Sequence, residues 1–506
     1  MSAAQRARGD GDGFRDSTAA ARRLAPEART ETGSACSRCL DALIVAINQI
    51  SNVRQWYTSG KQLQLASSML CEAWRTAHTV HLRVCDRTPT TLLPAAGVPR
   101  ANPEGGVFPQ VPRVRASWLK WQLPSLSLLS NSASDFAEVE ELFLGMSVND
   151  ILEVRVWPNR LRSITFGMGS GFNEAIIGVA WPASLRHLEF GRHFDQPIEG
   201  VLWPTSLERL VLGVAFNQAI ELVIWPDSLQ QLRLGQSFNQ PIERVQWPES
   251  LQTLSFGLRF NQPIERVAWP ASLQMLAFGD AFNRPIENVT WPTSLRKLNF
   301  WKFFNQPIER VTWPPSLQHL GFWGLFDKPI VGATWPTFLQ EIVLTRNFNH
   351  PIAGVRWPAS LHRIVLGHHF DQPIDEVTWP HSLRKLRFGH CFNQPIADVT
   401  WPPSLEDLSF GRDFNQPVQE VRWPSLRRFS LKCNFSQSLQ NLGTVMPSLE
   451  QFTLCFPFNQ DRYRLLRGIE WPAGLLQVSV SCAEDVYFEG ISIPPNVSVS
   501  YVGSYF

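Results

Sequence analysis

The stretch "FNQPIERVQWPESLQTLSFG" occupies residues 238 to 257, and the chain repeats it almost unchanged from Phe260 as "FNQPIERVAWPASLQMLAFG". A Trp-Pro pair recurs at intervals of 22 residues from Trp181 to Trp423. A strict period of this length is typical of a solenoid, in which one repeat forms one coil that cannot bury its own apolar face. Neighbouring coils must bury that face together, so each large apolar residue is expected to stack on its own copy.

Each repeat holds two short apolar strings, Ile242-x-x-Val245-x-Trp247 and Leu251-x-x-Leu254-x-Phe256. In each string the last two large residues are two positions apart, which places them on one face of an extended strand. The pattern therefore predicts a coil with two strand-like sides.

The residues between the strings predict the corners of the coil. Pro248 has no N–H to donate and favours extended geometry in the residue before it, which suits a corner. The stretch from Gly257 to Pro263 predicts the other corner, because glycine permits a bend and Asn239, like its later copies, can bond to local backbone.

The whole pattern, F-N-Q-P-I-x-x-V-x-W-P-x-S-L-x-x-L-x-F-G, resembles the FNIP repeat, a relative of the leucine-rich repeats. The resemblance covers roughly residues 140 to 480, and it departs from the family in carrying Trp before Pro where many members have a smaller aliphatic residue. It implies a curved solenoid used for protein recognition. It implies no family-wide catalytic residues.

The fold class predicted is mainly β, a solenoid of about 22-residue coils with a small helical segment before it. Residues 1–34 are rich in Ala, Arg, Gly and Asp and are predicted to be disordered. Helical periodicity over residues 35–87 predicts the helical segment, and the Pro, Gly and Ala of residues 88–115 predict a linker. The repeats over 140–480 form the solenoid, and the strand-rich tail 481–506 is expected to cap it.

Composition restricts the partners and the location. Lys and Arg total 46 against 44 Asp and Glu, so no general electrostatic footprint for nucleic acid or an anionic membrane is expected. The sequence offers no signal-peptide core and no run of apolar residues long enough to span a membrane. Eight scattered cysteines are typical of reduced thiols, and a cytoplasmic protein is predicted.

No sequence signature of catalysis is present, because phosphate-binding loops, H-E-x-x-H and G-x-S-x-G are all missing. The acidic residues recur once per coil and predict a solvated stripe. We therefore expect no enzyme, no cofactor and no metal. His368 and His390 are one period apart beside His369 and Cys391, within metal-binding reach, but Arg346 and Arg412 at the same repeat position argue against a metal there.

Two functions remain open from the sequence. The first is a scaffold that presents one face of the solenoid to a protein partner. The second is an F-box-like substrate adaptor of a ubiquitin ligase, in which residues 36–85 bind a ligase subunit and the solenoid selects the target. Residues around Trp74 faintly resemble the C-terminal half of an F-box, although the Leu-Pro-acidic start of that family is missing.

A break in the repeat locates a candidate binding patch. Most coils have glycine after the second string, at positions 191, 213, 235, 257, 279, 367, 389 and 411, but three consecutive coils have Trp301, Trp323 and Thr345 there. The two indoles are expected to project from a narrow corner, with Gly321 leaving a recess nearby. The alternative is that the indoles fill a local gap in the core. The predicted partner-binding residues are Trp301, Trp323, Lys302, Phe303, His319 and Arg346.

Overall fold

The computed structural model describes residues 119–121, 139–144, 157–432, 434–455, 468–481 and 493–501. The chain divides into two compact units, Met1–Ala116 and Ser117–Phe506, and every described residue belongs to the second unit. The predicted disordered N-terminus, the helical segment 35–87 and the linker 88–115 lie outside the described residues. So do residues 36–85, on which the ligase-adaptor alternative depends.

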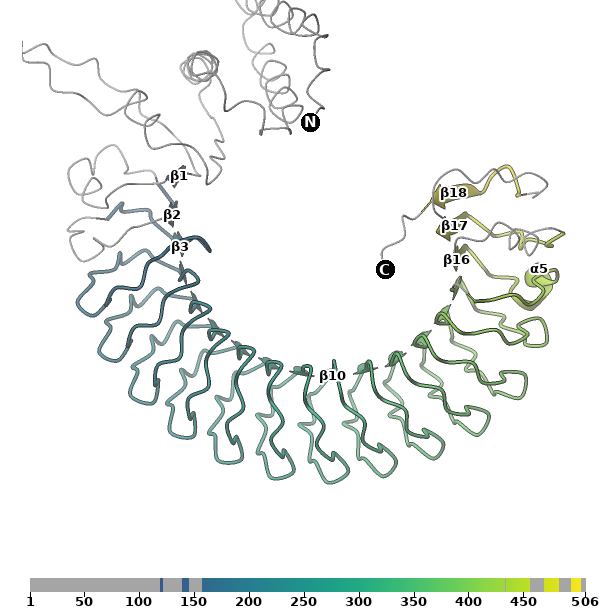
Figure 1. Ribbon diagram of the computed structural model, residues 1–506, viewed down its shortest axis with the longest axis horizontal. Helices are drawn as coiled ribbons and strands as arrows, with labels where there is room; N and C mark the ends of the chain where they lie inside the picture. Colours follow the sequence, from purple (N-terminus) through teal and green to yellow (C-terminus); the bar gives the residue numbers. More distant parts are fainter. Residues whose placement is uncertain are drawn as a thin grey trace, which may run out of the picture. The chain divides into compact units, whose positions relative to one another are not determined.

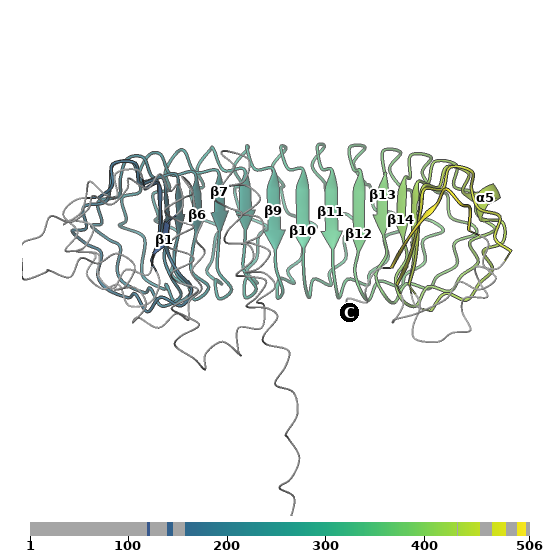
Figure 2. The ribbon, with the colours of Figure 1, turned by 90° about the horizontal axis from the view of Figure 1, so that it is seen from above.

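The described part of the second unit is a parallel β-solenoid with one short strand per coil, and each strand pairs with the next from β1 to β18. Figure 1 shows the coils of this unit arranged as an arc with the strands along its inner side, and Figure 2 shows the strands as a continuous sheet. The strand face is therefore the concave face. The strands are β1 Leu119–Trp121, β2 Glu141–Leu144, β3 Ser163–Phe166, β4 His187–Glu189, β5 Arg209–Val211, β6 Gln231–Arg233, β7 Thr253–Ser255, β8 Met275–Ala277, β9 Lys297–Phe300, β10 His319–Phe322, β11 Glu341–Leu344, β12 Arg363–Leu366, β13 Lys385–Arg387, β14 Asp407–Ser409, β15 Arg428–Leu431, β16 Gln451–Cys455, β17 Gln477–Ser481 and β18 Ser498–Tyr501.

The sheet register follows the sequence period. Leu254 pairs with Leu276, and Leu276 pairs with Leu298, so equivalent residues of successive coils lie side by side. The predicted stacking of each residue on its own copy is confirmed. Strand β1 precedes the predicted start of the solenoid at residue 140, and β18 lies in the tail 481–506 that was predicted to be rich in strands.

The expectation of two strand-like sides per coil is wrong, because only the second apolar string forms a strand. One turn lies within the first string, where Val245 N–H donates to the Ile242 carbonyl at 3.3 Å, and another follows it, where Leu251 N–H donates to the Pro248 carbonyl at 3.0 Å. The residues left between these turns are too few to form a ladder with the neighbouring coil. They fill the core without belonging to the sheet.

The core consists of columns of identical side chains inside the coils. Phe238, Ile242, Leu251 and Leu254 are each fully buried. Along the Phe column the ring centroids of successive coils lie 6.0 to 6.3 Å apart with nearly parallel planes, from Phe172 to Phe435. Burying this aromatic and aliphatic surface is the main source of the solenoid's stability.

Polar residues of the repeat also pair with the next coil. The Asn261 backbone N–H donates to Asn239 Oδ1 at 2.9 Å, and the Ser272 hydroxyl donates to the Leu251 carbonyl at 2.7 Å. The expected local backbone bond of Asn239 is therefore replaced by a bond between coils. This explains why most coils keep Asn or Asp at this position and Ser before the Leu, because their loss would leave backbone groups of the adjacent coil without a partner.

Among the described residues the α-helical structure amounts to one short helix, α5 Leu442–Val445, in the region where the repeat pattern weakens. Within the same residues, no helix has the length and apolar character needed to cross a membrane.

Candidate protein-binding site

In most coils the residue at the corner after the strand is glycine, because neighbouring coils approach very closely there. A Cβ atom at Gly257 would overlap the carbonyl oxygen of Gly235 and lie 2.5 Å from the Gln236 Cα. Both obstacles are backbone, which cannot rotate away as a side chain can. Any larger residue at this corner therefore requires a different backbone path.

The three exceptional coils have that different path. In the coil of Gly257 the strand is three residues long, and Phe256 N–H donates to the Ala277 carbonyl of the next coil at 2.9 Å. In the exceptional coils the strand is four residues long, and Trp323 N–H donates to the Phe300 carbonyl of the preceding coil at 2.8 Å. Thr345 N–H donates to the Phe322 carbonyl in the same way, at 2.9 Å. The strand pairing continues one residue further and leaves room for a side chain.

Trp301 and Trp323 stack on one another at this corner, as the sequence predicted. Their ring centroids lie 5.8 Å apart with an interplanar angle of 23°, and the residues remain 44% and 41% exposed. Trp residues of the core column, by comparison, are mostly below 10% exposed. The indoles therefore do not fill a gap in the core, which was the alternative interpretation of the sequence.

The recess expected beside Gly321 is not open, which corrects the sequence interpretation. The Trp323 indole N–H donates to Asn299 Oδ1 at 3.0 Å, and this bond draws the ring over Gly321. A Cβ at Gly321 would overlap the Trp323 Nε1 and lie 2.6 Å from Asn299 Oδ1. Gly321 thus makes room for the indole of Trp323 and leaves no room for a partner's side chain.

The aromatic surface continues into the next turn. Phe303 is 45% exposed, and the Lys302 ammonium lies 5.1 Å from its ring centroid, within range of a cation–π interaction. Arg346 occupies the corner position two coils after Lys302 and has φ of 59°, in the left-handed region that a residue with a Cβ rarely adopts. We name Trp301, Lys302, Phe303, Trp323 and Arg346 the corner patch.

His319 lies on the concave strand β10, where it is already engaged. Its Nδ1 is 3.0 Å from Glu341 Oε2, and Arg363 Nη1 lies 2.7 Å from the other oxygen of that carboxylate. The hydrogen bond from His319 is the largest influence on Glu341 and lowers its pKa below the ordinary value, against the opposing effect of burial. Sequence reasoning missed Glu341, although residues of alternating charge at His319, Glu341 and Arg363, spaced by one period, could have indicated the cluster.

We expect Glu341→Gln to lower the free energy of unfolding by no more than about 1 kcal/mol at pH 7, because the ion pairs are half-exposed. The folded-state pKa of Glu341 lies below its ordinary value, so its stabilising effect is present at neutral pH and is lost as the pH falls through that lowered pKa. Melting temperatures of both proteins at pH 7 and pH 3 measure this. A difference that stays constant between the two pH values would contradict the pairing.

Two shallow depressions lie on the concave face, one along β3 to β5 near His187 and one along β5 to β7 near Arg233, with volumes of about 150 and 140 Å³. Sites for drug-sized ligands usually measure about 300–1,000 Å³. These depressions are too small to enclose such a ligand, and the corner patch is the more prominent feature.

Comparison with known proteins agrees with the repeat pattern. The FNIP Repeat family model matches residues 172–214, 216–259, 260–303, 282–324, 348–391 and 392–421. A search of curated proteins gave no match. The chain carries FNIP repeats between residues 172 and 421, and its coils form a solenoid of the leucine-rich-repeat type.

The solved structure of CroV588 supports this architecture. CroV588, described as a novel circular LRR protein, is 31% identical with a TM-score of 0.61, over 76% of this chain and 58% of that protein. This chain thus spans little more than half the length of CroV588. LIC12759, an LRR protein from Leptospira interrogans, is 16% identical over 67% of this chain and 91% of that one, with a TM-score of 0.46. The internalin InlF from Listeria monocytogenes is 12% identical over 74% and 92%, with a TM-score of 0.37.

Proposed function

We propose that this protein is a non-enzymatic scaffold of the cytoplasm that binds a protein partner at the corner patch. The observation that carries the proposal is the exposed, stacked pair Trp301 and Trp323, at a corner that other coils close with glycine. Trp and Arg are enriched among the residues that dominate binding energy in protein interfaces. Large aromatic side chains that stay more than 40% exposed add little to the core, which supports a role in recognition.

The charges around the patch favour an acidic partner. Lys302 and Arg346 flank the indoles, and Lys297 lies on the adjoining strand β9. Asp280 is an acidic residue near the patch, at the repeat position of Lys302 but one coil earlier. The carboxylate of Glu341 is already paired with Arg363 and His319. A peptide segment with apolar side chains for the indoles and carboxylates for the cations complements this arrangement.

The test uses the full chain and a random peptide display library. We expect selected peptides to be rich in Asp, Glu and apolar residues, and we expect Trp301→Gly/Trp323→Gly to weaken their binding by at least about tenfold, or 1.4 kcal/mol. The substitutions restore the residue of the other coils, so the melting temperature should change little. Phe338→Ser is the matched control, because Phe338 is 62% exposed outside the patch, and binding should persist.

A second variant keeps the test decisive if the double variant loses stability. Lys302→Glu leaves the indoles in place and reverses one charge, so it should weaken the acidic peptides and leave the fold intact. Selection of basic or uncharged peptides, or equal binding by the wild type and the two patch variants, would contradict the proposal. The ligase-adaptor alternative concerns residues 36–85 and is tested separately, by deleting residues 1–110 and asking whether a ligase subunit is lost from purified complexes.

A further inference from the structure

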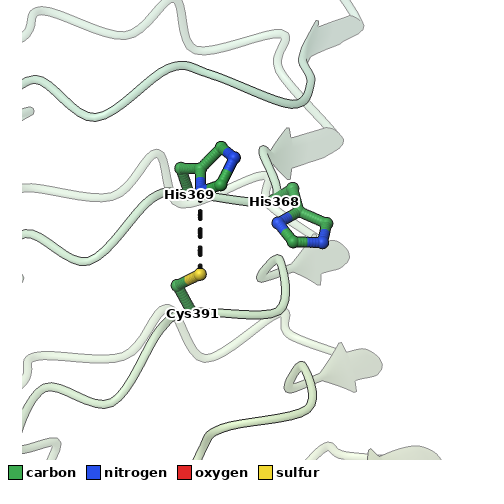
Figure 3. A group of neighbouring side chains, drawn as sticks. All are labelled: His368, His369 and Cys391. Atoms are coloured by element: carbon green, nitrogen blue, oxygen red, sulfur yellow. Dashed lines mark hydrogen bonds between the residues drawn. The ribbon is translucent and has the colours of Figure 1, made fainter.

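A cluster of nitrogen and sulfur ligands begins one coil beyond Arg346, the last residue of the corner patch. His368 and His369 follow strand β12, and Cys391 follows strand β13 one coil later (Figure 3). Their backbone is held by the solenoid itself: His369 N–H donates to the Arg346 carbonyl at 2.8 Å, and Cys391 N–H donates to the His368 carbonyl at 2.9 Å. The three side chains are thus presented from two coils whose relative position is fixed by main-chain bonds.

The ligand atoms are close enough to share one metal ion. One ligand atom from each of the three residues lies within 4.8 Å of the other two, and Cys391 Sγ is 3.8 Å from His369 Nδ1. In a tetrahedral zinc site, bonds of about 2.0–2.1 Å to nitrogen and about 2.3 Å to sulfur place the two ligands about 3.5 Å apart. Small rotations of side chains that are exposed or half-exposed suffice to reach that geometry.

The chemistry of the set selects the ion. Two imidazoles and one thiolate suit Zn²⁺ and other borderline transition metals, whereas Ca²⁺ and Mg²⁺ require oxygen ligands. Cys391 is a free thiol, so it is available to lose its proton to a metal. The ring of His390 packs against that of His368 with centroids 4.2 Å apart, which restricts the orientation of His368.

The cationic neighbours that argued against a metal in the sequence have a smaller effect than expected. The pKa of His368 is lowered first by burial, then by His369 and only then by Arg346, while Asp413 opposes the shift. Asp413 and Asp371 supply negative charge beside Cys391, where they add to the effect of burial in raising the pKa of the thiol. The same carboxylates attract a cation toward the cluster.

We propose that His368, His369 and Cys391 bind one Zn²⁺ ion, with water in the fourth position, and so connect two adjacent coils. The site lies outside the corner patch, so it does not depend on the proposed partner.

Titration of the full chain with CoCl₂ tests the proposal, because Co²⁺ reports thiolate ligation by charge-transfer absorption in the near ultraviolet. Other cysteines of the chain can contribute to the signal, so the measured quantity is the difference between the wild type and Cys391→Ser. We expect that difference to correspond to one Co²⁺ ion per chain. Addition of ZnCl₂ should displace this ion and abolish the difference. His369→Ala and His368→Ala should each weaken Zn²⁺ binding by more than about 100-fold, beyond the loss typical of outer-shell changes.

Cys455→Ser is the matched control, since Cys455 is also a free, half-exposed thiol and lies outside the cluster. It should keep the full signal. ZnCl₂ should raise the melting temperature of the wild type and of Cys455→Ser by a larger increment than that of Cys391→Ser. An unchanged cobalt spectrum in Cys391→Ser, or a signal that survives in both histidine variants, would overturn this set of ligands. If the variants and the wild type melt at the same temperature without metal, misfolding is excluded as the cause of a lost cobalt signal.

Discussion

Phe282→Ala is expected to lower the free energy of unfolding by about 3–5 kcal/mol, as large-to-small changes in a packed core do. Phe282 is 1% exposed, and its ring centroid lies 4.2 Å from that of Phe278. It also lies 6.1 Å from the equivalent rings of the coils on both sides, Phe260 and Phe304. Since each coil is stabilised mainly by its neighbours, the loss should spread to the adjacent coils.

Amide hydrogen exchange resolved by coil, together with chemical denaturation, measures this effect. We expect faster exchange in the strands on both sides of the substitution, β8 and β9, and a smaller effect with distance. Phe338→Ala is the control, because a residue 62% exposed should change the stability by less than about 0.5 kcal/mol. Equal effects of the two substitutions would show that the buried column does not hold the coils together.

Gly257→Ala is expected to cost about 3 kcal/mol or more, although it adds only a methyl group. The new Cβ would overlap the Gly235 carbonyl and lie 2.5 Å from the Gln236 Cα, so the two coils must separate or adopt the longer strand seen at Trp301. Gly171→Ala is the matched control, because a Cβ there meets no atom within 4 Å. Denaturation midpoints of the two variants should differ clearly. A cost below about 1 kcal/mol for Gly257→Ala would mean that the corner is looser than the structure indicates.

The sequence predicted the solenoid because a strict period requires identical environments along the array. The 22-residue spacing of Trp-Pro pairs and of the Phe column was sufficient to identify the coils and the residues of the core. The number of strands per coil could not be predicted from the apolar pattern, because the two strings look alike. Turns formed by backbone bonds at Ile242 and Pro248, and not the side-chain pattern, decide that only one of them pairs.

Contacts between coils account for the other differences. Asn239 was expected to bond locally, but its amide oxygen is aligned with the N–H of Asn261 one coil later, a relation that exists only after stacking. The position of Trp323 over Gly321 depends in the same way on Asn299, a residue of the preceding coil. The break in the glycine column could nevertheless be found in the sequence, because most other coils have glycine at this corner.

A hydrogen-exchange footprint tests most directly whether the exposed corner at Trp301 and Trp323 binds a partner. The full chain is compared with and without an acidic peptide selected against it. We expect slower exchange at residues 300–304, 322–326 and 344–347, at the end of strands β9 to β11. Slower exchange confined to the concave strands β12 and β13, where Arg363, Lys385 and Arg387 offer a basic surface, would contradict it.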